Sequence, residues 1–257
     1  MARLGLDQLL EVAPRHLATY RERTRDLSRE DKGIRRSEMF FLYATVADLA
    51  PSRIIESGRA RAQSTLVLSA VFPDAEIISI ESDANSPDAA IAAERLASRT
   101  NVECRFGDSR ELLGALVLAG DVILIDGPKD FRAIKLALEL LRTGKPVAVF
   151  VHDLWPGSPA RGFVDRGLPS AFLSDAPEWV RRYAALDSRR KTLPALPETG
   201  RVIYGATLGC FPGGTENYSA RLLSCSFAQG LERLAVNLSK WRKPAMHDRP
   251  PDFTRVA

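Results

Sequence analysis

The chain has 257 residues, of which 45% are hydrophobic and 26% are charged, so it is long enough for one large globular domain or two small ones. Its formal net charge is only +4, and its basic residues lie in scattered pairs that are not interleaved with aromatic side chains, which disfavours a nucleic-acid partner. The three cysteines lack zinc-type spacing and no apolar run approaches the roughly 18–20 residues that span a bilayer, so we expect a cytoplasmic protein without membrane contact.

The first half of the chain alternates between two kinds of predicted element. Residues 1–36 are rich in charge and are expected to form a helical extension, and residues 37–49 are apolar around most of a helical circumference, which is typical of a helix packed on a sheet. Short apolar strands then alternate with helices, which predicts an α/β fold with a doubly wound, mostly parallel sheet. The strands are predicted at 53–56, 76–80, 102–106, 122–125 and 147–151, and the helices at 64–71, 87–98, 109–119 and 130–141.

The alternation stops near residue 155. Residues 155–200 are rich in proline, contain one predicted helix at 178–185, and are expected to form a lid or substrate wall, or merely a connection. Residues 201–208 resume strand character and residues 211–214 indicate a loop. Residues 219–241 predict an amphipathic helix that either covers the sheet or joins two copies of the chain in a homo-oligomer. The main domain is therefore expected to span 37–242, with a flexible tail at 243–257.

Polar or acidic side chains follow all five predicted parallel strands. Ligands of open α/β sheets bind at the carboxyl ends of the strands, near the switch in strand order, so we expect these side chains to converge on one ligand. A small-residue loop before a helix lets backbone N–H groups approach that ligand, and an acid after the second strand can accept two hydrogen bonds from a ribose diol. The candidates in chain order are Glu56 and Gly58, then Glu81, then Asp108 and Ser109, then Asp126, and finally His152 and Asp153.

As an ordered set, these motifs resemble those of the class I S-adenosylmethionine-dependent methyltransferases. Within that class, residues 37–155 look most like the small-molecule O-methyltransferases typified by catechol O-methyltransferase, and like a cephalosporin hydroxylase and sugar O-methyltransferase branch. The resemblance implies a seven-stranded Rossmann-like sheet. It also implies that Glu56, Gly58 and Ser64 hold the methionine end of S-adenosylmethionine, that Glu81 binds the ribose, and that Asp108 and Ser109 contact the adenine.

The resemblance assigns further roles at the ends of the fourth and fifth strands. Asp126 and Lys129 match a D-x-x-K pattern in which the aspartate binds a divalent metal and the lysine is the general base. We also expect Asp126 to be one of the residues that bind the cofactor. Asp153 matches a second metal ligand, and His152 is either a third ligand or a general base without metal. This donor set suits Mn²⁺, Fe²⁺ or Zn²⁺ better than Mg²⁺. Beside such a cation, burial and like charge are expected to lower the pKa of Lys129.

The sequence departs from this pattern at two positions. Ala62 replaces the second glycine of the loop, where we expect it to adopt right-handed helical dihedrals, and Leu154 replaces an asparagine beside Asp153. Arg59 and Arg61 are expected to face solvent, or alternatively to attract an anionic group.

Together these features predict an S-adenosylmethionine-dependent O-methyltransferase that acts on a hydroxyl of a small molecule of sugar or natural-product type, with or without a divalent cation. Two alternatives stay open. One is a cofactor-binding protein without catalysis, and the other is a nicotinamide-dependent oxidoreductase, which the absence of G-x-G-x-x-G disfavours.

Overall fold

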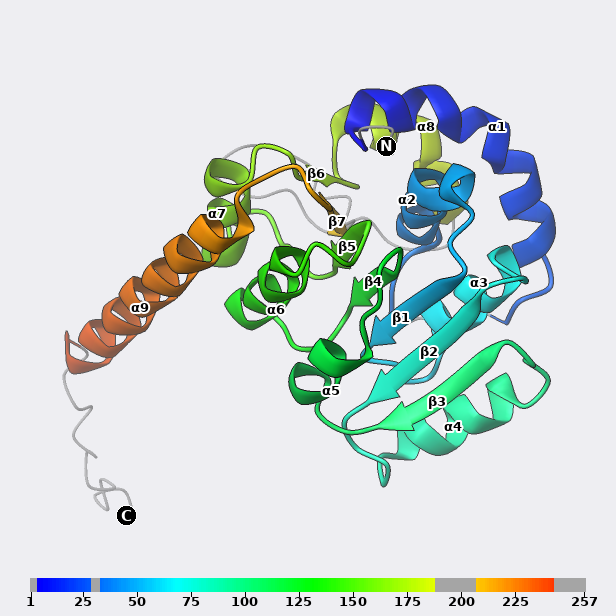
Figure 1. Ribbon diagram of the computed structural model, residues 1–257, viewed down its shortest axis with the longest axis horizontal. Helices are drawn as coiled ribbons and strands as arrows, with labels where there is room; N and C mark the ends of the chain where they lie inside the picture. The colour runs from blue at the N-terminus through cyan, green and yellow to red at the C-terminus, as the bar shows by residue number, and fades with distance from the viewer. Residues whose placement is uncertain (1–3, 29–32, 188–206, 243–257) are drawn as a thin grey trace, which may run out of the picture.

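The computed structural model of the protein describes residues 4–28, 33–187 and 207–242. Seven strands of this described chain form one sheet in the order β3-β2-β1-β4-β5-β7-β6 (Figure 1). The first five strands are parallel, and β7 runs antiparallel to both of its neighbours. The strands are β1 (Arg53–Ser57), β2 (Glu76–Glu81), β3 (Val102–Phe106), β4 (Val122–Ile125), β5 (Ala148–Val151), β6 (Phe172–Leu173) and β7 (Gly209–Pro212).

The strand order confirms the predicted fold class. The chain order reverses between β1 and β4, which is the switch point at which doubly wound sheets bind their ligands. In this register Ile55 of β1 lies opposite Ile78 of β2 and Ile123 of β4. A mostly parallel sheet of seven strands in this order is the Rossmann-like methyltransferase fold, and it positions the ends of β1, β2, β4 and β5 along one edge.

Helices cover both faces of the sheet (Figure 1). Successive strand residues alternate between two cores, because side chains of a strand point to opposite faces: Ile54 joins one core and Ile55 the other. The first face is covered by α1 (Leu6–Thr24), α2 (Arg36–Val46), α3 (Gln63–Val71) and α8 (Pro177–Tyr183), and the second by α5 (Ser109–Leu116), α6 (Phe131–Arg142), α7 (Pro159–Gly167) and α9 (Tyr218–Arg242). Helix α4 (Pro87–Leu96) packs against α3.

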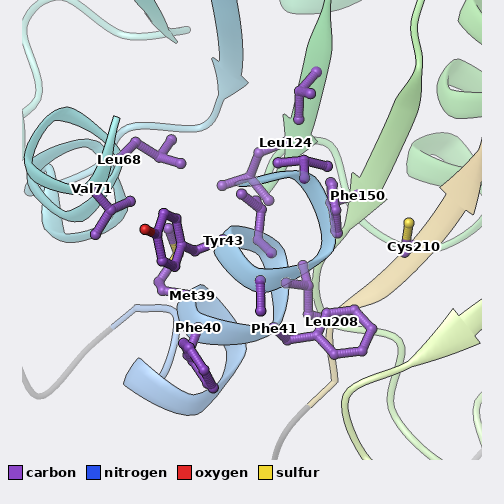
Figure 2. Close-up of a cluster of buried hydrophobic side chains, with 14 of the residues drawn as sticks. Met39, Phe40, Phe41, Tyr43, Leu68, Val71, Leu124, Phe150, Leu208 and Cys210 are labelled. Atoms are coloured by element: carbon purple, nitrogen blue, oxygen red, sulfur yellow. The ribbon is translucent and has the colours of Figure 1, made fainter. Parts of the chain in front are cut away.

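Helix α2 is the central element of the first core. All of its residues from Ser37 to Val46 are buried, as expected for a helix that is apolar on every side. Figure 2 shows Phe40 and Phe41 of this helix in a cluster with side chains of α3 and of the sheet. Phe40 also stacks on Trp179 of α8, with 5.4 Å between the ring centroids. The helix predicted at 37–49 is therefore confirmed, with its last three residues forming a 3₁₀ turn.

The last strand differs from the prediction. The strand expected at 201–208 lies mostly outside the described residues, and the strand in the sheet is β7, which includes Phe211 and Pro212 of the predicted loop. Gly209 at its start and Gly213 directly after it lower the β propensity of the segment, so the sequence pattern did not indicate a strand here. A Cβ on Gly209 would lie 2.7 Å from the Leu154 side chain, and one on Gly213 would lie 2.3 Å from the carbonyl oxygen of Pro146. This strand therefore forms because glycine allows close packing at these two positions, and not because its residues have a high β propensity.

The proline-rich segment is more ordered than the sequence suggested. Ser158 caps a helix that we did not predict, α7, by accepting a hydrogen bond from the Arg161 N–H, and Pro159 occupies its first turn. Strand β6 then joins the edge of the sheet. The part of the segment that reaches Asp187 is thus packed into the fold, while residues 188–200 and the tail at 243–257 lie outside the described residues. None of the described helices is both long and apolar enough to cross a bilayer.

Candidate active site

Four of the predicted site residues meet at the ends of β4 and β5. Lys129 lies in the loop after β4, and its Nζ donates to Asp126 Oδ1 at 2.6 Å and contacts Asp153 Oδ2 at 2.7 Å. His152, the first residue after β5, places Nδ1 2.8 Å from Asp126 Oδ1. The fold therefore gathers the two acids around two basic side chains, as the edge rule for parallel sheets predicts. We call these four residues, together with Glu38, the charged cluster.

Glu38 is the member of the charged cluster that sequence reasoning missed. It lies in α2, only 1% exposed, and its Oε2 is 3.4 Å from His152 Nε2. Its carboxylate also accepts hydrogen bonds from the N–H of Arg35 at 2.8 Å and from the N–H of Thr207 at 2.6 Å. The sequence feature that could have revealed Glu38 is an acid at the start of an otherwise apolar helix that is buried. Such an acid must find hydrogen-bond or charge partners in the interior.

The charges around His152 determine its protonation state. Burial alone lowers the pKa of a histidine, but Glu38 and Asp126 outweigh it and raise the pKa of His152 to about 10. In return, although burial raises the pKa of Glu38 and of Asp126, the interaction with His152 holds each pKa below its ordinary value. His152 is therefore an imidazolium at neutral pH, with no lone pair for a proton or a metal, and either predicted role requires it first to release that proton.

Lys129 does not show the lowered pKa that we expected. Burial acts in that direction, but the neighbouring carboxylates of Asp126 and Asp153 outweigh it and hold the pKa of Lys129 above its ordinary value. The expectation assumed a cation beside the lysine, whereas the described groups that contact its Nζ are two carboxylates. As described, Lys129 is an ammonium group that bridges the two carboxylates.

A second acidic position lies at the end of β1. Glu56 is fully buried, and its Oε2 accepts hydrogen bonds from Thr65 Oγ1 at 2.5 Å and from Ser79 Oγ at 2.6 Å. Burial raises the pKa of Glu56, and the nearby hydroxyls of Ser64, Ser79 and Thr65 oppose this only in part. Its other oxygen, Oε1, is buried without a hydrogen-bond partner among the described residues. A carboxylate oxygen in this condition is suited to receive a ligand's donor group.

The loop after β1 contacts the loop after β4 through Gly58. Gly58 has φ +93°, and a Cβ there would lie 2.7 Å from the backbone N of Gly127 and 2.9 Å from the carbonyl carbon of Asp126. Further along, Ala62 has φ 60°, so our expectation of right-handed dihedrals is wrong: the backbone keeps the left-handed turn that a glycine would favour. Glu81, at the end of β2, reaches back to accept a hydrogen bond from the Ala60 N–H at 2.8 Å.

The two loop arginines both have partners within the fold, but only Arg59 is buried. Arg59 is only 3% exposed, donates to the carbonyl oxygen of Ser79 at 2.7 Å, and lies over the ring of Phe106 with its Cζ 4.8 Å from the centroid. The expectation that Arg59 faces solvent is therefore wrong, because carbonyls at strand ends and an aromatic face satisfy its charge. Arg61 pairs with Asp88 of α4 at 2.7 Å.

The two residues expected near an adenine lie at the start of α5. Asp108 is the N-cap of this helix and accepts a hydrogen bond from the Arg110 N–H at 2.9 Å. The Ser109 hydroxyl accepts a hydrogen bond from Ser57 Oγ at 2.7 Å and thereby faces the loop after β1. Ser109 thus points toward the other candidate residues, whereas the Asp108 carboxylate is engaged with Arg110.

Three potential metal ligands lie close together at the ends of β4 and β5. Ligand atoms of Asp126, His152 and Asp153 lie within 4.8 Å of one another. Leu154, which stands where the catechol enzyme has an asparagine, is 1% exposed and packs in the second core, so it adds no ligand. The ammonium of Lys129 lies between the two carboxylates, and it would have to move for an ion to bind both.

No protein-family model matches the sequence, and no curated protein matches it at a significant level. Solved structures with a similar arrangement include the O-methyltransferase TomG of Streptomyces achromogenes in complex with S-adenosylmethionine, which is 20% identical with a TM-score of 0.44, over 83% of this chain and 93% of that one. An O-methyltransferase from Bacillus cereus in complex with S-adenosylhomocysteine is 18% identical with a TM-score of 0.43, over 81% and 91%. These similarities concern the fold.

Proposed function

We propose that the protein is an S-adenosylmethionine-dependent O-methyltransferase that transfers a methyl group to a hydroxyl of a small molecule of sugar or natural-product type. The observation that carries this proposal is the convergence at the switch point of the sheet. Acids from the ends of β1 and β2 lie on one side of it, and the charged cluster from the ends of β4 and β5 lies on the other. One side suits a cofactor with an amino acid and a ribose, and the other suits a reacting hydroxyl.

The cofactor side offers a donor or acceptor for each part of S-adenosylmethionine. The unpartnered Oε1 of Glu56 is a suitable acceptor for the ammonium group of the methionine moiety. The N-terminus of α3, whose first N–H groups have no partners within the helix, favours its carboxylate. Glu81 is proposed to accept hydrogen bonds from the ribose diol. Asp108 and Ser109 are proposed to lie toward the adenine.

The chemistry required of the protein is alignment and removal of one proton. S-Adenosylmethionine supplies an electrophilic methyl group, which leaves the sulfonium sulfur with its bond to carbon breaking as the bond to the acceptor oxygen forms. Lys129, once neutral, would take the hydroxyl proton as general base. Asp126 and Asp153 would orient the lysine, and His152 would hold Asp126 in position. A divalent cation bound by Asp126, Asp153 and His152 would lower the pKa of the hydroxyl.

Calorimetric titration with S-adenosylhomocysteine, S-adenosylmethionine and NAD tests the cofactor assignment. We expect the adenosyl compounds to bind and NAD not to bind, and Glu81→Ala to weaken binding at least ~10-fold through lost ribose hydrogen bonds. Glu103→Ala is the matched control, because Glu103 is an exposed acid on the neighbouring strand β3 whose carboxylate pairs with Arg105. Binding of NAD alone would favour an oxidoreductase. Adenosyl binding without S-adenosylhomocysteine production across a panel of hydroxylated acceptors would favour a cofactor-binding protein without catalysis.

A further inference from the structure

Helix α9 carries a row of large apolar side chains on its outer face. Leu223, Phe227, Leu231 and Leu234 are 75%, 71%, 52% and 60% exposed, and we call them the α9 stripe. Their spacing places them along one side of the helix. The opposite side holds the buried Cys225, which packs in the second core. Figure 1 shows α9 on the outside of the fold beside α6 and α7, and the exposed fractions place the stripe on the solvent side of the helix.

We propose that the α9 stripe binds the α9 stripe of a second copy of the chain, with the two helices antiparallel about a two-fold axis. One register pairs three of the four stripe residues, and it leaves Leu231 opposite Ser226. It sets Leu223 of one copy against Leu234 of the other, and Phe227 against Gly230. Both pairings fit this register, because Leu223 and Phe227 are separated by the same four positions as Gly230 and Leu234. The contact is therefore self-complementary, as a two-fold dimer requires.

Gly230 supplies the space that the register needs. Apart from its chain neighbours and the backbone of its own helix, nothing lies within 4 Å of the position that a Cβ would take on Gly230, so this point of the exposed face is open. A Phe227 ring from the second copy would fill it as a knob fills a hole in paired helices. Because both copies carry both residues, the pairing occurs twice.

Area and charge also suit a second copy. With roughly 200 Å² for each fully exposed large side chain, the stripe offers about 500 Å² per chain. A standard interface buries about 800 Å² per partner, of which about 65% is apolar in homodimers, so the stripe supplies about that apolar share. In this register Arg233 lies opposite Ser224 of the second copy, so like charges do not meet there.

Sedimentation velocity of the full-length chain, from about 1 to 100 µM, tests the dimer. We expect a concentration-dependent dimer. Phe227→Glu should weaken it at least ~30-fold, because it removes the central side chain and puts a charge in its place. The matched control is Leu118→Glu, which alters another exposed leucine (54% exposed) away from α9 and should leave the dimer intact.

Gly230→Leu distinguishes the proposed register from non-specific hydrophobic association. The substitution enlarges the apolar stripe and favours the helix, so unspecific association would tighten, whereas the proposed pairing would weaken because the hole for Phe227 is filled. Circular dichroism establishes that each variant is folded. The dimer is overturned if the unmodified chain stays monomeric throughout, which would leave the stripe to a different partner. It is equally overturned if Phe227→Glu dimerises like the unmodified chain, or if Gly230→Leu associates as tightly or more tightly.

Discussion

His152 and Glu38 lie 114 positions apart in the chain, yet their Nε2 and Oε2 atoms are 3.4 Å apart at the end of β5. This contact links the central helix of the first core to the edge of the sheet where we place the reaction. Since Asp126 holds the other ring nitrogen, the imidazole is fixed at both ends. The packing of α2 therefore controls the orientation and the charge of a side chain in the proposed site.

The pH dependence of stability should report this contact. The pKa of His152 is raised to about 10 in the folded chain from 6.5 when unfolded, so its stabilising effect is full below about pH 6.5 and is lost as the pH rises through 10. We expect the free energy of unfolding to fall across this window by a few kcal/mol at most. Glu38→Gln should lower the pKa of His152, which is measurable by NMR titration, and flatten the decline. An unchanged histidine pKa in Glu38→Gln would contradict the pairing.

Replacing Lys129 with methionine tests its role as the base. Lys129→Met should reduce turnover about 10²–10⁴-fold, because the acceptor hydroxyl loses its proton acceptor, while the dissociation constant for S-adenosylhomocysteine stays nearly unchanged. Lys135→Met is the control, since Lys135 is a half-exposed lysine on α6 with only a 4.0 Å contact to Glu139. Because the pKa of Lys129 is raised, activity should increase with pH in the alkaline range. Full turnover in Lys129→Met removes the residue from the mechanism.

The ammonium of Lys129 should also compete with a divalent cation. It contacts Asp126 and Asp153 at 2.6 and 2.7 Å, so Mn²⁺ must displace it to reach both carboxylates. We expect Lys129→Met to bind Mn²⁺ at least ~10-fold more tightly than the unmodified chain in a calorimetric titration without cofactor. Adding Asp153→Asn should remove the gain. Equal Mn²⁺ affinity with and without the lysine would show that the ion, if it binds, does not use this pair.

Gly58 offers a clean test of the contact between the loops after β1 and β4. Gly58→Ala should destabilise the protein by about 2 kcal/mol or more and weaken cofactor binding, because its Cβ would collide with backbone of Gly127 and Asp126. Gly120→Ala is a matched control: Gly120 has the same φ of +93° but open space around a Cβ. Thermal or urea unfolding of both variants separates the collision from the backbone strain. Similar losses in the two would mean that the loops do not need this close approach.

The sequence by itself determined the order of the elements and the edge on which the polar residues gather. Buried parallel strands need apolar runs such as Val122–Ile125, and the residues that follow them, such as Asp126 and His152, must reach one edge because the strands run in the same direction. Patterns along the chain did not predict α7 or β7. Helix α7 forms in a proline-rich segment because Ser158 caps it, and β7 forms in a glycine-rich segment because only glycine fits the close packing there.

Only the tertiary structure decided the charge states and the hidden members of the site. The pKa values of His152 and Lys129 depend on which acids lie within a few ångströms, and the nearest acid to His152 Nε2 among the described residues comes from a distant helix, α2. Arg59 is likewise buried by carbonyls and a ring that adjoin it only after folding. Sequence patterns encode periodicity along the chain, whereas electrostatic interactions act through space and fall off with distance, so they are set only when the elements have packed.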